Sequence, residues 1–353
     1  MNDRLGYDGQ QYAWLTLRLR GLDAPAPREP LAFRVAPAAI VAASGLDVRI
    51  GFLALDVAAL GGTALVLIAL LRRFGATAGV ALLGVSLWAL LPFTVRAAIH
   101  TPVLTDAVSG LLGAALLLCA LSRRYAVFAV LLLVGALTRE SLLLFAPCAI
   151  LAARRDGNAL RVAVASLPAF AAFAIVRILP PVAPDVAMPS SATLVRYHVG
   201  RFLLNVDASP LRQAFAIPLS LGVVLGSPLA MPRATAALAR REAAWVLFVP
   251  LVVLAGVVGG MEPDRYDTTL APLLLVGAAP ALGAAAARPI VAGALVVAQA
   301  IACRAFIPLD GSEASAFAFS VATMPASAIV LWGTLALALA VASTLAMRWA
   351  ATR

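Results

Sequence analysis

The chain has 353 residues, of which 63% are hydrophobic and only 12% are charged. Soluble globular domains are about 45–50% apolar and about 25% charged, so this composition excludes an ordinary soluble protein. The formal net charge is +10, but every basic residue is arginine, and the arginines stand singly or in pairs at the ends of apolar runs. That distribution indicates membrane topology and excludes a nucleic-acid-binding stripe.

Apolar runs predict the transmembrane helices, because about 20 apolar residues in a helix cross about 30 Å of hydrocarbon. We expect an all-α, polytopic helical bundle with about 11 spans. In chain order these are residues 50–71, 77–96, 105–121, 125–137, 141–153, 160–179, 214–231, 243–260, 268–287, 289–307 and 323–347. Residues 50–353 would form this transmembrane domain, and residues 1–49 an extracytoplasmic loop.

The charges between the runs alternate along the chain. Turns rich in arginine are expected in the cytoplasm; they contain Arg72, Arg73, Arg123, Arg124, Arg154, Arg155, Arg161, Arg233, Arg240, Arg241, Arg288, Arg348 and Arg353. The other turns hold most of the acids and would face outward: Asp106, Glu140, Asp185, Asp207, Glu262, Asp264, Asp267, Asp310 and Glu313. An odd number of spans with the last end inside places residues 1–49 outside, and we expect a further helix upstream of them.

Two of the predicted spans are too short to cross a bilayer. Residues 125–137 and 141–153 have about 13 residues each, or about 20 Å of helix. The turn at Thr138, Arg139 and Glu140 would therefore lie at the depth of the outer leaflet. Either Arg139 and Glu140 pair with each other or extend to the interface, or they line a site that opens outward.

Short polar motifs in the outer segments resemble, in their order along the chain, those of bacterial polytopic glycosyltransferases of the GT-C class. The resemblance covers about residues 6–275. It rests on Tyr-Asp-Gly-Gln-x-Tyr at residues 7–12, x-Arg-x-x-Pro at residues 33–37, Thr105-Asp106, Leu-Thr-Arg-Glu at residues 137–140, and Asp264-Arg265-Tyr266 followed by Pro272. These motifs would place the active site on the outer face of the bacterial inner membrane.

The resemblance implies transfer of a sugar from a polyprenyl-phosphate carrier to a hydroxyl of a glycan, lipid or protein acceptor. Asp8 is the candidate base, because a carboxylate can accept the proton of the acceptor hydroxyl. Asp106 would assist Asp8, and these two carboxylates would hold a divalent cation such as Mg²⁺ or Mn²⁺ if one takes part. The expected substrate-binding residues are Gln10, Tyr12, Arg34, Arg139, Glu140, Arg265 and Tyr266. Arg139 and Arg265 would hold the donor phosphate, and Glu140 would fix Arg139.

Other functions compete with this interpretation. A multi-pass transporter or flippase of an envelope precursor is the main alternative, although the two halves show no internal repeat and the acids gather in the outer turns. A non-catalytic assembly partner and an intramembrane protease also stay open. Asp8-Gly9 alone is equally typical of an ordinary turn. The chain has only 2 histidines and 3 cysteines, which excludes a histidine-rich metal cage and a disulfide framework.

Overall fold

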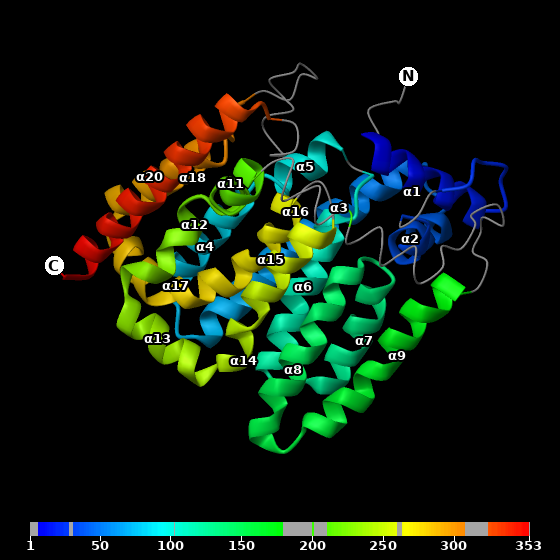
Figure 1. Ribbon diagram of the computed structural model, residues 1–353, viewed down its shortest axis with the longest axis horizontal. Coiled ribbons are helices and arrows are strands. Elements are labelled where there is room, and N and C mark those ends of the chain that lie inside the picture. The colour runs from blue at the N-terminus through cyan, green and yellow to red at the C-terminus, as the bar shows by residue number, and fades with distance from the viewer. Residues whose placement is uncertain are drawn as a thin grey trace. The chain divides into compact units, whose positions relative to one another are not determined.

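A computed structural model describes residues 6–27, 31–101, 103–178, 200, 210–259, 263–307 and 324–352. Within these residues all regular secondary structure is helical, as the composition predicts (Figure 1). Five of the acids expected in outer turns lie outside the described residues: Asp185, Asp207, Glu262, Asp310 and Glu313. The chain divides into two units, Met1–Thr63 with Ala97–Leu194, and Ala64–Arg96 with Val195–Arg353.

The first unit contains the helices that carry most of the candidate site residues. They are α1 (Gly6–Leu19), η1 (Leu31–Phe33), α2 (Val35–Ser44), most of α3 (Val48–Arg73), most of α5 (Val95–His100), α6 (Asp106–Leu121), α7 (Tyr125–Ala136), η2 (Glu140–Leu144), α8 (Phe145–Ala153), η3 (Arg154–Asp156) and α9 (Ala159–Ile178). α7 packs against α6 and α9, α8 packs against α9, and α1 packs against α2. Within the predicted loop of residues 1–49, the described residues thus include three helical segments, α1, η1 and α2, each of which has residues buried in this unit.

The core beside α1 explains why that helix is held in place. Tyr12 and Phe52 are fully buried in one apolar cluster, with their ring centroids 6.5 Å apart. α2 ends at Gly45, whose φ of 69° suits a residue without a Cβ atom. α3 begins where the Asp47 carboxylate accepts hydrogen bonds from the backbone N–H groups of residues 49 and 50. Local capping and apolar burial therefore bring α1, α2 and α3 together.

The second unit contains the remaining helices. They are α4 (Ala78–Ala89), α11 (Pro210–Leu221), α12 (Val223–Gly226), η4 (Ser227–Ala230), α13 (Pro232–Arg241), α14 (Ala243–Val246), α15 (Phe248–Gly259), α16 (Pro263–Asp267), η5 (Thr268–Leu270), α17 (Ala271–Ala286), α18 (Pro289–Ala302) and α20 (Ala326–Thr352). α20 packs against α11, α17 and α18, and α17 packs against α4. Unlike the first unit, this one contains a sharp break within a predicted span.

That break separates α11 from the helical segment Val223–Ala230, which leaves at an angle of 87°. Gly222 forms the corner with a φ of 52°. The backbone groups that the break releases bind Gln299, whose Oε1 accepts from Val223 N at 2.7 Å and whose Nε2 donates to Leu221 O at 3.3 Å. Because the freed groups have a polar partner inside the protein, the chain can turn here at low cost.

Four helices are long and apolar enough to cross a membrane, or five if the bent pair counts as one span. They are Val48–Arg73, Ala159–Arg177, Arg265–Ala286 and Ala326–Thr352, with Pro210–Ala230 as the bent pair. This supports a membrane protein, but the predicted number of about 11 spans is not confirmed. Each predicted run does contain helix, yet the shorter apolar helices have 10–17 residues, or about 15–26 Å.

The predicted interruption near residue 139 is confirmed. α7 ends at Ala136, and η2 and α8 follow only from Glu140. The backbone of Arg139 is extended, with φ −159° and ψ 126°. Leu142 then packs beside Gly135, where an added Cβ would lie 3.2 Å from the leucine side chain. The chain therefore reverses direction tightly at this point.

Candidate functional site

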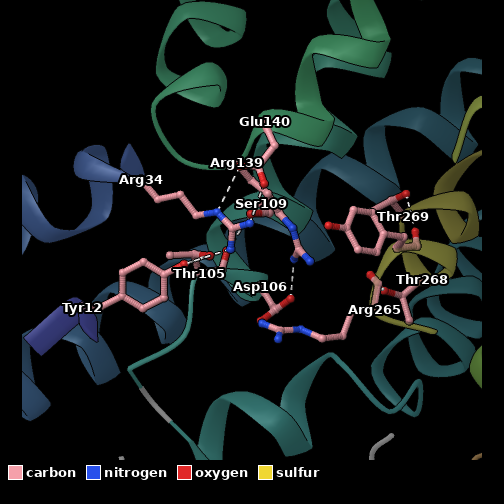
Figure 2. A network of polar contacts seen from close by, with 11 residues as sticks. Tyr12, Arg34, Thr105, Asp106, Ser109, Arg139, Glu140, Arg265, Thr268 and Thr269 are labelled. Atoms are coloured by element: carbon pink, nitrogen blue, oxygen red, sulfur yellow. Dashed lines mark hydrogen bonds and ion pairs between the residues drawn. The ribbon is translucent and has the colours of Figure 1, made fainter. Parts of the chain in front are cut away.

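Arg34 joins three segments of the first unit that lie far apart in the sequence. Its Nε and Nη2 donate to the two carboxylate oxygens of Glu140, at 3.1 and 2.6 Å. Its Nη1 donates to the hydroxyl of Tyr12 at 3.1 Å, and this hydroxyl lies 3.4 Å from Thr105 Oγ1 (Figure 2). The two-pronged contact fixes the plane of the guanidinium as well as its position.

Arg139 and Asp106 form a second, more deeply buried pair. Arg139 Nη1 lies 2.5 Å from Asp106 Oδ1, and the two side chains are 5% and 8% exposed (Figure 2). Asp106 stands in the first turn of α6, where the N-terminal end of the helix favours a negative charge. We call Tyr12, Arg34, Asp106, Arg139 and Glu140 together the ionic cluster.

The ion pairs around residue 139 differ from the expected pairing of Glu140 with Arg139. Glu140 binds Arg34, and Arg139 binds Asp106. The reason is the extended backbone of Arg139, since successive side chains of an extended segment point to opposite sides. The charge of Arg139 still acts on Glu140 and helps to lower the pKa of this carboxyl.

The backbone also holds this connection in place. Ala36 N, in the first turn of α2, donates to Leu137 O at 3.0 Å. Thr138 is fully buried, and its hydroxyl donates to Val134 O at 2.8 Å. Both contacts fix the residues that precede Arg139, so its guanidinium is positioned by the backbone as well as by Asp106.

Electrostatics favour the ionised form of Glu140. Burial alone would raise the pKa of this carboxyl, but the charge and hydrogen bonds of Arg34 outweigh burial and lower the pKa from 4.5 to about 2. Glu140 is thus a stable anion at neutral pH. It neutralises Arg34 and is poorly suited to carry a proton during a reaction.

Asp8 and Gln10, the two other candidates from the first motif, lie on α1 and are half-buried. Asp8 precedes Tyr12 by four residues, so the two share one face of the helix. The face of α1 that joins the ionic cluster through Tyr12 therefore also carries the candidate base. Gln10 is two residues away from both Asp8 and Tyr12, so it lies on another face of α1.

A metal centre at Asp8 and Asp106 finds little support. Nowhere in the described part of the chain do three or more histidine, cysteine, aspartate or glutamate residues gather as ligands would. One oxygen of Asp106 is bound to Arg139. We therefore assign no reaction step to a metal ion.

Arg265 and Tyr266 belong to the second unit, where they lie on α16. The Arg265 guanidinium carbon is 5.8 Å from the centroid of the Phe93 ring, and Tyr266 is 8% exposed. The hydroxyls of Thr268 and Thr269 donate to the backbone carbonyls of Arg265 and Tyr266. These hydrogen bonds hold the backbone of Arg265 and Tyr266 in place shortly before α17 begins.

The sequence analysis overlooked one acidic residue. Asp56 is the only acid in α3 and is 1% exposed. Its Oδ1 has no hydrogen-bond partner among the residues that the structure describes. The signal was present in the sequence, because an acid inside an apolar run of span length is costly and marks a candidate functional position.

Comparison with models of known protein families, with characterised proteins and with solved structures finds no match to this chain. The functional argument therefore depends on the geometry of the ionic cluster and on the chemistry of its residues.

Proposed function

We propose that this protein is a membrane glycosyltransferase that moves a sugar from a polyprenyl-phosphate carrier to an acceptor hydroxyl. One observation carries the proposal. Five residues chosen from four separate sequence motifs, Tyr12, Arg34, Asp106, Arg139 and Glu140, meet in a single cluster of the first unit. Motifs that matched only by chance would have no reason to converge.

Asp8 is the proposed base. In the reaction, the acceptor oxygen forms a bond to the anomeric carbon of the sugar, and the bond from that carbon to the carrier phosphate breaks. The acceptor proton passes to a carboxylate, and the carrier leaves as its phosphate. Asp8 suits this role because it is half-buried and shares the helix face of Tyr12, a member of the ionic cluster.

Arg139 is the proposed phosphate ligand in the first unit. Its pair with Asp106 keeps the guanidinium in a fixed orientation before the donor binds. A phosphate presents the same bidentate oxygen geometry as a carboxylate, so it can compete with Asp106 for this cation. Once the phosphate has displaced Asp106, it meets a positive charge that the backbone already holds in position.

The other candidates fall into two groups. Arg34 and Glu140 neutralise each other and, with Tyr12, brace the cluster, so we assign them to positioning Arg139 and Asp8. Gln10, Arg265 and Tyr266 remain proposed contacts to the donor or the acceptor.

We place the site on the outer face of the bacterial inner membrane. The support is the alternation of arginine-rich and acidic turns along the sequence. Single cysteines in place of two exposed residues, Asp23 in the segment expected outside and Arg240 in a turn expected inside, test this orientation in intact cells. An impermeant thiol reagent should label the first without permeabilisation and the second only after it; the reverse pattern would refute the orientation.

The reaction is tested in membranes by following the consumption of a polyprenyl-phosphate-linked sugar. Asp8→Asn should bind the donor yet lose about 10²–10⁴-fold in turnover, the usual cost of removing a general base. Asp23→Asn, which changes an exposed acid beyond the end of α1, is the matched control and should act like the wild type. An Asp8→Asn protein with unchanged turnover would show that Asp8 is only a structural residue.

A further inference from the structure

Asp56 is buried on the inward face of a helix that can span a membrane. The side chains at Phe52, Asp56, Ala59 and Thr63 follow one another at helical spacing, and each is at most 2% exposed. Phe52 packs beside the ring of Tyr12, which fixes where this face points. The Asp56 side chain is therefore on the buried face of α3 and points into the first unit.

α3 and α6 approach each other closely next to this face. An added Cβ at Gly62 would lie 3.0 Å from the Leu111 side chain of α6, so any larger residue here would have to displace that side chain. Further along the same two helices, the charges of Asp56 and Asp106 act on each other. Two carboxyl groups thus share one weakly hydrated region, where like charges repel strongly.

Arg139 forms an ion pair with one of these two carboxyl groups, that of Asp106. Arg139 binds Asp106 directly, whereas Asp56 Oδ1 has no hydrogen-bond partner within the described residues. The Tyr12 phenol on α1, whose ring lies beside Phe52 on the same face of α3, accepts a hydrogen bond from Arg34. A second bare anion here would be uncompensated, and a buried carboxylate in that position takes up a proton instead.

We propose that Asp56 is a proton-binding site inside the first unit, where it is held as the neutral carboxylic acid beside the ionised Asp106–Arg139 pair. A proton on Asp56 removes the repulsion and leaves Asp106 free to bind Arg139. Two interacting carboxyls of this kind hold one proton between them. Because Arg139 stabilises the ionised form of Asp106, the proton resides on Asp56. The site is distinct from Asp8, which is the proposed base for the acceptor.

Infrared spectroscopy of the full chain in lipid at neutral pH tests this directly. The chain has 17 acidic residues, and exposed ones are ionised at that pH. A neutral carboxyl absorbs in its own carbonyl region and shifts in D₂O. We expect such a band in the wild type, its loss in Asp56→Asn, and its retention in Asp47→Asn, which changes an exposed acid on the same chain segment.

The stability of the variant gives a second readout. Asparagine copies the shape and neutrality of a protonated aspartate, so Asp56→Asn should keep the helix content and thermal midpoint of the wild type. No neutral-carboxyl band in the wild type, or a band that survives in Asp56→Asn, would overturn the proposal. A large drop in stability with Asp56→Asn would also overturn it, because an ionised Asp56 with its own cation would then be indicated. No substrate is needed, so the result is independent of the proposed transferase activity.

Discussion

The two units both bury polar side chains, but they use them for different purposes. In the first unit, Arg34 binds Glu140 and Arg139 binds Asp106, so charged side chains bind one another. In the second unit, Gln299 contacts Val223 N, Leu221 O, Leu87 O and Cys303 Sγ. We call this second group the amide clasp; its contacts go mostly to the backbone.

The difference agrees with the proposal that the first cluster serves a reaction and the second the fold. The amide clasp satisfies backbone groups that the bend at Gly222 releases, so its presence is explained by the fold alone. The ion pairs of the ionic cluster, in contrast, bind side chains and no backbone groups that a helix break releases. Burying four charged groups to hold a connection in place is an expensive way to gain stability, which favours a chemical reason for it.

The largest effect is expected at the most buried ion pair. Arg139→Gln leaves Asp106 as a buried charge without its cation and should cost about 3–5 kcal/mol of unfolding free energy, measured by denaturation in detergent. Replacing both residues with leucine should recover most of this stability, because no charge remains, while sugar transfer stays lost. If Arg139→Gln were as stable as the wild type, the Arg139–Asp106 ion pair would not contribute to stability.

A smaller loss is expected at Glu140. Its side chain is 29% exposed, so water screens part of the interaction, and Glu140→Gln should cost about 2–3 kcal/mol. The matched control is Asp156→Asn, which breaks a 2.8 Å pair with Arg123, whose side chain is 68% exposed. That change should cost at most about 1 kcal/mol. Equal losses in the two variants would erase the distinction between the ionic cluster and a surface pair.

Acid should weaken the ionic cluster through the same residue. Because Arg34 lowers the pKa of Glu140 from 4.5 to about 2, the stability it contributes is complete above about pH 4.5 and falls as the pH drops toward 2. At about pH 3 the loss should reach about 2 kcal/mol. Thermal unfolding of the wild type and Glu140→Gln across this range measures it. A variant with the same acid sensitivity as the wild type would assign the effect to other groups.

The smallest effect is expected in the amide clasp. Gln299→Leu leaves the N–H of Val223 without its acceptor and should cost about 1 kcal/mol, with sugar transfer per folded molecule unchanged. Gln213→Leu, at a half-buried position on α11, should cost almost nothing and serves as the control. Lost transfer in folded Gln299→Leu would mean that the second cluster is also functional.

Local features of the fold were readable from the sequence. Apolar runs predicted where helices lie, and two runs of about 13 residues predicted the interruption around Arg139. The number of spans was not readable in the same way. Several of the runs form helices of only 10–17 residues. Another run is broken at Gly222, where the freed backbone groups bind a distant residue, Gln299.

The site could be predicted only as a set of residues. The motifs selected all five members of the ionic cluster, but not their pairing. Which arginine binds which acid depends on the extended backbone of Arg139 and on the approach of α2 to Leu137. Asp56 stands out in the sequence as an acid within an apolar run. Its burial becomes apparent only once α3 packs against its neighbours.

The extended conformation of Arg139 also constrains how the segment can change in length. Arg139 and Glu140 serve opposite sides of the connection, and Ala36 N fixes its start at Leu137. Inserting one residue after Thr138 would put the arginine in the place of Glu140, facing Arg34, so that a contact between like charges would replace that ion pair. This connection should therefore tolerate substitutions at its buried positions better than any gain or loss of a single residue.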